Sequence, residues 1–234
     1  MKFILASQNA HKAQEFAAAI QSIVVETAPH GIEVDENADS FVGNATIKAR
    51  AYSAEFGVNA VADDSGLCVD ALNGAPGVHS QRYAILPPDI DDDSDRTAAN
   101  NRKLLRALAG VPESGRGAHF ACALCLVVVD AADIEVIRRL APKACDWDIH
   151  FYDNRGREIR REDEGICRAE LTIERHAYGH ILNEQHGKGG FGYDPLFYCP
   201  EAQCTFAELT REQKLSVSHR GKAIAALCEL FSGI

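Results

Sequence analysis

Two adjacent carboxylates are the residues of this chain best suited to chemistry. In the run ADDSGL at 62–67, Asp63 and Asp64 follow the apolar residues of a short predicted strand and precede a Ser-Gly pair typical of a turn. Carboxylates in such a place can hold a divalent cation or accept a proton from water. Taken alone, the pair is explained more simply by a turn whose side chains accept hydrogen bonds from backbone N–H groups. Other residues must therefore decide between a turn and a metal-binding or catalytic site.

A polar run near the start, SQNAHK at 7–12, lies where a predicted strand turns into a helix. Free backbone N–H groups at a helix start form a phosphate cradle, although the glycines of a Walker A loop are missing. Capping alone accounts for Ser7 and Asn9. Lys12 is electrostatically unfavourable at a helix N-terminus and therefore indicates a bound anion.

A glycine-rich loop, GKGGFGYDP at 187–195, could bind a base. Its glycines allow a ligand to approach the backbone, Phe191 and Tyr193 offer faces for stacking, and Asp194 can accept from a ring N–H group. The competing interpretation is a flexible glycine-rich loop whose aromatic side chains pack against the protein and bind no ligand.

Further donors, Lys214, His219 and Arg220, lie in or just before the start of the last predicted helix. A helix N-terminus attracts anions, so these donors suit a phosphate or a base carbonyl, although a surface salt bridge would explain Arg220 as well. The alternating acids at 89–95 lack the Gly and Glu of a calcium loop and indicate a solvated acidic loop.

The composition is that of an ordinary globular protein. The 234 residues are 46% hydrophobic and carry a formal net charge of −10, with a pI near 5.3. This acidic composition argues against non-specific binding of polymeric nucleic acid, while an anionic small molecule could still bind in a locally basic pocket. No run approaches the roughly 18 apolar residues of a membrane span, and no signal peptide is evident, so we expect a cytoplasmic protein without a membrane partner.

The 8 cysteines are scattered rather than spaced as a disulfide framework, so we expect reduced thiols. Cys122 and Cys125 form a C-x-x-C inside an apolar run. On a strand, residues three apart point to opposite faces, which favours core thiols over a zinc or redox pair.

Hydrophobic periodicity predicts alternating strands and helices. The class is therefore α/β, and late hairpins favour a mixed sheet. Ser40 is available as an N-cap for the second helix. We expect strands at 3–6, 60–62, 120–129 and 166–173 and helices at 12–20, 41–56, 100–109 and 218–231. Charge-dense sequence at about 131–165 predicts an inserted β-hairpin in a single domain spanning 1–234.

These pieces together resemble the inosine triphosphate pyrophosphatase family, also called the Ham1 or RdgB type. The matching motifs occur in order along almost the whole chain, apart from about 131–165. They are ILASQN at 4–9, Phe41 with NA at 44–45 and KAR at 48–50, ADDSGL at 62–67, GAPGV at 74–78, GGFGYDP at 189–195 and SHRG at 218–221.

The resemblance implies an elongated mixed β-sheet flanked by helices, with two lobes and the active site in the groove between them. It also implies a homodimer, Mg²⁺, and cleavage of deaminated purine nucleoside triphosphates (ITP, dITP, XTP) between the α and β phosphates. The products would be a nucleoside monophosphate and pyrophosphate. Two alternatives are a Maf-like pyrophosphatase acting on pyrimidine or modified nucleotides and a nucleotide sensor without turnover.

The resemblance also assigns roles to residues. Asp64 is similar to the general base and metal ligand, Glu36 to the second metal carboxylate, and Asp63 to a supporting carboxylate. It implies triphosphate contacts at Ser7, Asn9, Lys12 and Lys48, a purine site at Phe191, Tyr193 and Asp194, and readers of the 6-oxo edge or adjacent groups at Lys214, His219 and Arg220. The remaining substrate-binding residues are Gln8, Ala10, His11, Asp63, Ser65 and Gly192.

Three positions depart from the family pattern. Gly43 replaces the usual Glu before Asn-Ala, so we expect a capping box without its Glu and a loss of helix stability of about 1 kcal/mol or less. His11 stands where small residues are usual, and we expect it to face solvent. The sequence around Glu36 is atypical, so Asp35 is an alternative metal ligand.

Overall fold

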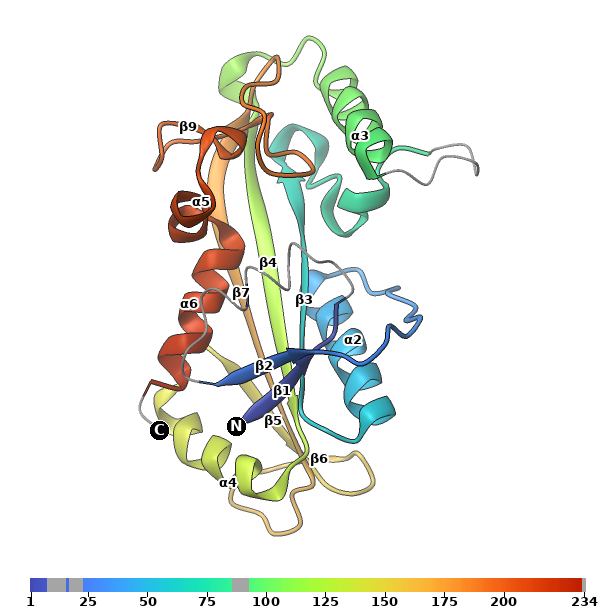
Figure 1. Cartoon of the computed structure of the whole chain (residues 1–234), viewed down its shortest axis with the longest axis vertical. Helices are drawn as coiled ribbons and strands as arrows, with labels where there is room; N and C mark the ends of the chain where they lie inside the picture. Colours follow the sequence, from blue (N-terminus) through green and yellow to red (C-terminus); the bar gives the residue numbers. More distant parts are fainter. Residues whose placement is uncertain (8–15, 17–22, 86–92, 233–234) are drawn as a thin grey trace. The chain divides into compact units, whose positions relative to one another are not determined.

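The structure is a computed structural model that describes residues 1–7, 16, 23–85 and 93–232 (Figure 1). The predicted helix at 12–20 therefore lies outside the described residues except for Phe16, which is helical and buried.

The strands are β1 (Lys2–Leu5), β2 (Val24–Thr27), β3 (Ala60–Val69), β4 (Gly117–Val128), β5 (Asp148–Tyr152), β6 (Glu158–Ile159), β7 (Arg168–Ile181), β8 (Phe197–Cys199) and β9 (Cys204–Thr205). The α-helices are α2 (Phe41–Phe56), α3 (Asp93–Ala107), α4 (Ala131–Leu140), α5 (Arg211–Val217) and α6 (His219–Leu230), and the 3₁₀ turns are η1 (Asp70–Leu72), η2 (Gly77–Arg82), η3 (Glu113–Gly115), η4 (Ala141–Lys143) and η5 (Phe206–Glu208).

The strands form a mixed sheet, which confirms the expected α/β class. Its order is β2-β1-β3-β4-β7-β5-β6, and β8 pairs with β7 and β9. Strand β1 is parallel to β2 and β3, whereas β5 runs antiparallel to β6 and β7. Parallel pairs need crossover connections, and a helix supplies one before β3, while the antiparallel pairs come from the later hairpins.

The chain divides into two compact units, and β3, β4 and β7 each contribute residues to both. The first unit comprises Met1–Asp64, Ala123–Glu174 and Ala223–Ile234, and the second comprises Ser65–Cys122 and Arg175–Lys222. The boundary in β3 falls between Asp64 and Ser65, so the acidic pair belongs to the first unit.

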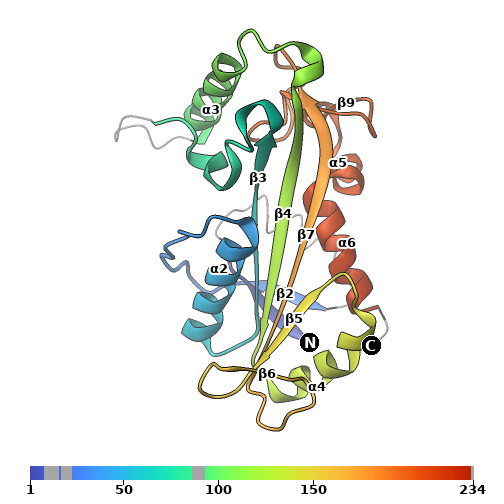
Figure 2. The ribbon, with the colours of Figure 1, turned by 180° about the vertical axis from the view of Figure 1, so that it is seen from behind.

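Helix α2 in the first unit has the bounds that its periodicity predicts. The Ser40 side chain accepts from the N–H of Gly43 and caps the start, and Gly57 ends the helix in the left-handed conformation. Ala45, Ala49 and Tyr52 are buried against the unit's core. Figures 1 and 2 show α2 on one side of the strands of this unit and the C-terminal half of α6 on the other.

The core of the second unit forms around the ends of β3, β4 and β7. Leu67 and Val69 of β3 and Leu104 and Leu108 from α3 and its C-terminal end are completely buried in one cluster with Phe120, Tyr193, Phe197 and Phe206. Helix α3 thereby lies next to the glycine-rich loop, because Tyr193 of that loop shares its core.

The acidic pair does not end its strand, which corrects the predicted strand at 60–62. Strand β3 continues through Asp63, Asp64, Ser65 and Gly66 to Val69. Leu67 and Val69 are completely buried, so continuing the strand removes two large apolar side chains from water. The Ser-Gly pair is part of an extended segment and not a turn.

Two further predictions were wrong in their bounds. Helix α3 begins at Asp93 rather than at Asn100, so the end of the predicted acidic loop belongs to a helix. Residues 131–140 form helix α4, capped by Asp130, and within the predicted insertion the hairpin is limited to β5 and β6. Its turn is the predicted one: Asp153 accepts from the N–H groups of Arg155 and Arg157, and Gly156 has a φ of 72°.

All eight cysteines lie in the described residues and are free thiols. Cys122 and Cys125 are buried in β4, as expected for core residues, and burial raises the pKa of Cys125 to about 12. This thiol stays protonated and is a poor nucleophile or metal ligand. Within the described part of the chain, no helix is long and apolar enough to cross a membrane.

Candidate functional site

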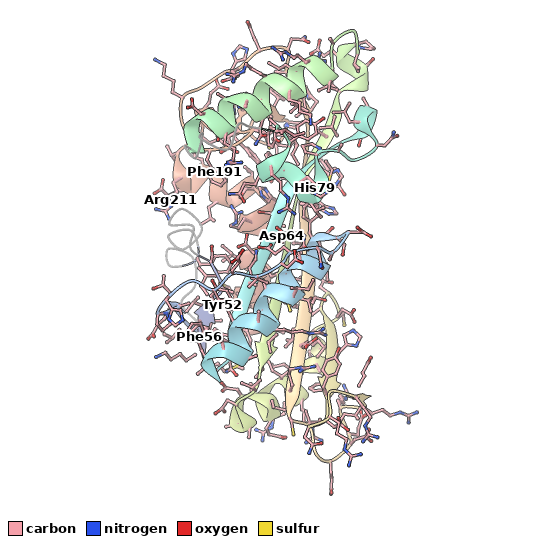
Figure 3. The ribbon with its side chains drawn as sticks, turned by 90° about the vertical axis from the view of Figure 1, so that its right-hand side faces the viewer. Tyr52, Phe56, Asp64, His79, Phe191 and Arg211 are labelled. Carbon is pink, nitrogen blue, oxygen red and sulfur yellow. The ribbon has the colours of Figure 1, made fainter. Side chains whose placement is uncertain are left out.

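The candidate catalytic carboxylates of the first unit surround one lysine. The Lys48 Nζ lies 2.7 Å from Glu36 Oε2 and donates to the backbone carbonyl of Asp63 over 3.1 Å. Asp63 is completely buried, whereas Asp64, on the same strand, is partly exposed beside α2 (Figure 3). The structure thus brings Glu36 and Lys48 together at the acidic pair.

The charge of Lys48 depends on this setting. Burial acts to lower the pKa of its ammonium group, but the negative charges of Asp63, Glu36 and Asp64 outweigh burial, and the pKa is raised above its ordinary value. Lys48 is therefore fixed as a cation. The three carboxylates around it leave the cluster negative overall, which suits a divalent cation.

Asn44 is a residue of this cluster that the sequence analysis named only as part of a matching motif. It is buried, its Nδ2 donates to Asp64 Oδ2 over 3.1 Å, and its Oδ1 accepts from the N–H of Ala38 over 2.9 Å. Asn44 thus orients the Asp64 carboxylate and also holds the segment that carries Glu36. Its spacing of four residues from Lys48, on one face of a helix, is the signal that could have identified it.

The donor set suits Mg²⁺. Asp64 and Glu36 offer carboxylate oxygens, whereas Asp35 is exposed and accepts from Asn37. Among the residues that the structure describes, no three His, Cys, Asp or Glu side chains are grouped so that they could hold a metal by themselves. Mg²⁺ commonly uses one or two carboxylates together with waters and substrate phosphates, so the residues fit an ion that arrives with a nucleotide.

Gly43 has a packing role that the sequence did not reveal. A Cβ added there would lie 2.6 Å from the Cβ of Ala38 and 3.0 Å from Ser40 Oγ. A larger side chain could not stand here without a shift of the 38–40 segment.

In the second unit, Asp194 organises the glycine-rich loop. Its Oδ2 accepts from the N–H of Phe191 over 2.8 Å and from Lys214 Nζ over 2.6 Å, and both charged side chains are buried. Gly190 has a φ of 70°, and a Cβ there would collide with the Asp194 carboxylate. The loop is therefore closed around Asp194, which leaves this carboxylate engaged within the protein.

Cations cover the ring of Phe191, which is 36% exposed. Lys214 Nζ lies 4.4 Å from the ring centroid, and the Arg220 guanidinium carbon lies 5.9 Å from it. Cations held over an aromatic face are attracted by its quadrupole. Phe191 thus combines an accessible ring with donors beside it, as a base-binding site needs.

The start of α6 brings the predicted donors together. The His219 ring stacks on Phe120 with centroids 4.8 Å apart, and Arg220 Nη2 donates to Ser65 Oγ over 2.7 Å. Ser218 caps the helix through the N–H of Gly221. Ser65, a predicted substrate-binding residue, therefore contacts Arg220, which the resemblance placed toward the purine.

Tyr193 has a different environment from the one expected. It is only 4% exposed, and its hydroxyl donates to the carbonyl of Ser80 over 2.8 Å. Burial raises the pKa of its phenol, which stays a neutral donor. The alternation of aromatic and glycine residues suggested two stacking faces, but only Phe191 presents one, because Tyr193 points into the core.

The N-terminal phosphate cradle is described only in part. Ser7 follows β1, and its N–H donates to the carbonyl of Leu5 over 2.9 Å. The other predicted residues of the cradle, Gln8, Asn9, Ala10, His11 and Lys12, lie outside the described residues.

Comparisons with known proteins agree on one family. The model of the Ham1 family matches residues 3–139 and 165–230, so its unmatched segment, 140–164, is shorter than the predicted insertion and contains only the last residue of α4. The chain is 39% identical to a dITP/XTP pyrophosphatase of Desulforamulus reducens, over 99% of this chain and 96% of the relative. It is 40% identical to a dITP/XTP pyrophosphatase of Pseudomonas aeruginosa, over 97% and 94%.

Solved structures give the same answer for the fold. A HAM1 protein from Coxiella burnetii matches with a TM-score of 0.70 and 32% identity, over the whole of both chains. The Ham1 protein of Staphylococcus aureus matches with a TM-score of 0.70 and 28% identity, over 100% of this chain and 99% of that one.

Proposed function

Because the chain belongs to the Ham1 family, we propose that it hydrolyses the deaminated purine nucleoside triphosphates ITP, dITP and XTP. The products are the nucleoside monophosphate and pyrophosphate, and the reaction removes these nucleotides from the pool. The names of the relatives support this substrate class. The observation that carries the proposal is the exposed Phe191 ring with Lys214 and Arg220 beside it, because it joins a stacking face to donors for a base carbonyl.

Asp64 is the general base in this proposal. Asn44 fixes the carboxylate through Oδ2, so that Asp64 can accept a proton from a water molecule. The water oxygen then attacks the α-phosphorus, the α–β anhydride bond breaks, and pyrophosphate leaves with the bonding electrons. Asp63 acts by supporting the strand and the charge of Lys48.

Asp64 and Glu36 are the residues that would hold Mg²⁺, with Glu36 preferred over the exposed Asp35. The ion would neutralise negative charge on the triphosphate and its leaving pyrophosphate. Lys48 lies at the same carboxylates as a permanent cation and is placed to contact a phosphate. Ser7, Asn9 and Lys12 remain the predicted triphosphate contacts, and Gln8, Ala10 and His11 remain predicted substrate-binding residues.

Base selection follows from the donors of the second unit. Phe191 stacks on the purine, and Lys214, His219 and Arg220 donate to its 6-oxo edge or nearby groups. A 6-amino group offers a donor where the site has donors, so adenine leaves polar groups unpaired and is rejected. Gly192 allows close approach, while Tyr193 and Asp194 act indirectly, by anchoring the loop and holding Lys214.

We also propose that the enzyme works in the cytoplasm as a homodimer, as the family resemblance implies. The small-molecule substrate is its partner, since the acidic composition disfavours polymeric nucleic acid. Light scattering at several concentrations measures the assembly, and a single-chain mass at all of them would reject the dimer.

One assay tests the function. The protein is incubated with ITP, XTP, dUTP or ATP, with Mg²⁺ or with excess EDTA, and released pyrophosphate is measured. We expect turnover of ITP and XTP that needs the metal, with little release from ATP. A preference for dUTP would replace the proposal by a Maf-like activity, and binding of ITP without product would indicate a sensor.

A further inference from the structure

Helix α3 carries two adjacent buried asparagines that contact different segments of the second unit. Asn100 accepts from the N–H of Ala84 and donates to the carbonyls of Ser80 and Gln81, which lie at the end of η2. The Nδ2 of Asn101 donates to the carbonyl of Gly192 over 3.1 Å. Asn101 therefore joins α3 to the middle of the glycine-rich loop.

Asn101 is an unusual residue for its position. It is 2% exposed, and within the described part of the chain its Oδ1 has no hydrogen-bond partner. A buried acceptor without a protein partner is costly, whereas an apolar side chain of similar shape would avoid that cost. Stability alone therefore does not account for an amide here, and its single bond to Gly192 is the contact that distinguishes it from leucine.

The Gly192 carbonyl matters because of its neighbours. Gly192 has a φ of 61°, a conformation that glycine adopts freely, so its peptide can rotate unless it is held. On one side, the N–H of Phe191 is fixed by Asp194, and on the other, the Tyr193 hydroxyl is fixed by the Ser80 carbonyl. Asn101 holds the peptide between these anchors, next to the residue that carries the exposed ring.

We propose that Asn101 is a positioning residue for base recognition. By fixing the Gly192 carbonyl, it holds the exposed Phe191 ring beside Lys214 and Arg220 before a nucleotide binds. The substrate part of this inference rests on the proposed function, whereas the ordering of the loop does not. Because a preformed stacking face lowers the cost of binding, the effect falls on affinity for the base and not on the hydrolytic step.

The test uses Asn101→Leu in the full-length protein, with Asn100→Leu as the matched control on the same helix. In Asn101→Leu, loss of one hydrogen bond is offset by loss of the unpartnered acceptor, so we expect little change in Tm. The KM for ITP should rise roughly tenfold, with kcat within about twofold. Amide hydrogen exchange of the free protein should accelerate at 190–194. Asn100→Leu should lower Tm and accelerate exchange mainly at 80–84.

Each result decides between a positioning role and a merely structural one. Unchanged exchange at 190–194 together with an unchanged KM would overturn the proposal. It also fails if Asn101→Leu lowers Tm as much as Asn100→Leu and reduces kcat at constant KM. If the unaltered protein releases no pyrophosphate from ITP, the proposed function fails, and the exchange comparison still decides whether Asn101 orders the loop.

Discussion

Both units contain a lysine bonded to a carboxylate, yet the two surroundings are opposite in charge. Around Lys48, the three carboxylates of Glu36, Asp63 and Asp64 face one ammonium, a formal charge of −2. Around Lys214, one carboxylate, Asp194, faces two cations, Lys214 and Arg220, a formal charge of +1, and aromatic rings fill the remaining space.

The difference shows that the same type of ion pair, a lysine with a carboxylate, can occur in surroundings suited to two kinds of chemistry. A negative cluster on a strand suits a divalent cation and a base for water, whereas a positive cluster over an aromatic ring suits an electron-rich carbonyl on a flat base. The lysine is common to both clusters, and its neighbours determine the net charge around it. The predictions below test whether the first cluster acts on the phosphates and the second on the base.

Asp64→Asn should have the largest effect. Removing the base should lower kcat for ITP by roughly 10²–10⁴-fold, while binding of ITP is largely retained because the amide keeps the shape of the carboxylate. Single-turnover pyrophosphate release measures the rate, and calorimetric titration measures binding. The control is Asp35→Asn, which changes an exposed carboxylate on the neighbouring segment and should leave the rate nearly unchanged. Near-normal turnover by Asp64→Asn would remove the base assignment.

Replacing each lysine by methionine compares the two clusters directly. Either change should lower kcat/KM for ITP by about 100-fold, because it strands a buried or half-buried carboxylate and removes a contact. Lys48→Met should lower kcat/KM for all triphosphates alike, whereas Lys214→Met should reduce the preference for ITP over ATP. The preference is the ratio of the kcat/KM values, measured with ITP, XTP and ATP.

The double change Lys214→Met with Asp194→Asn serves as the control for this comparison. It removes the stranded carboxylate and should restore part of the lost stability without restoring base preference. Equal loss of preference in Lys48→Met and Lys214→Met would contradict the division of labour between the clusters.

Asn44→Ala should have a smaller effect, confined to the first cluster. It frees Asp64 Oδ2 and the N–H of Ala38, so kcat should fall roughly tenfold while KM stays within about twofold. Thr46→Ala, on the same helix, removes bonds to the carbonyl of Val42 and to Cys125, none of them to Asp64, and is the matched control. If both variants show the same loss of kcat, the effect of Asn44 comes from the helix and not from Asp64.

The sequence predicted the elements of the first cluster better than their connections. The bounds of α2 follow from its periodicity and its Ser40 cap, and the motif around Asp64 identified the carboxylates. The extension of β3 to Val69 could not be predicted locally, because a Ser-Gly pair is typical of a turn and only tertiary burial of Leu67 and Val69 keeps the strand extended.

In the second cluster, residue types were predicted more reliably than orientations. Phe191 and Tyr193 alternate in the sequence, but one ring is exposed and the other is buried against Ser80. Nothing in the loop itself indicates which, because the choice depends on the Asn101 and Ser80 contacts, which come from segments about 90 and 110 residues away. Contacts of that range are set by the fold and are not visible in a local pattern.

His150 also lies between two carboxylates, but its side chain is more exposed than those of Lys48 and Lys214. It therefore tests whether burial strengthens the ion pairs in the other two clusters. In the hairpin, His150 lies 2.7 Å from Glu158 and 3.0 Å from Asp148, with a side chain that is 36% exposed. The hydrogen bond to Glu158, followed by that to Asp148, raises the pKa of His150 above its ordinary value of about 6.5.

Because this pKa is raised in the folded protein, its contribution to stability is fully present below about pH 6.5 and is lost as the pH rises through the raised value. We therefore expect the Tm difference between the unaltered protein and His150→Gln to be small, and larger near pH 6 than near pH 9. Thermal unfolding at both pH values measures it. Solvent screening should keep this change in Tm small. A Tm difference that grows with pH would show that the charged imidazole of His150 does not stabilise the hairpin.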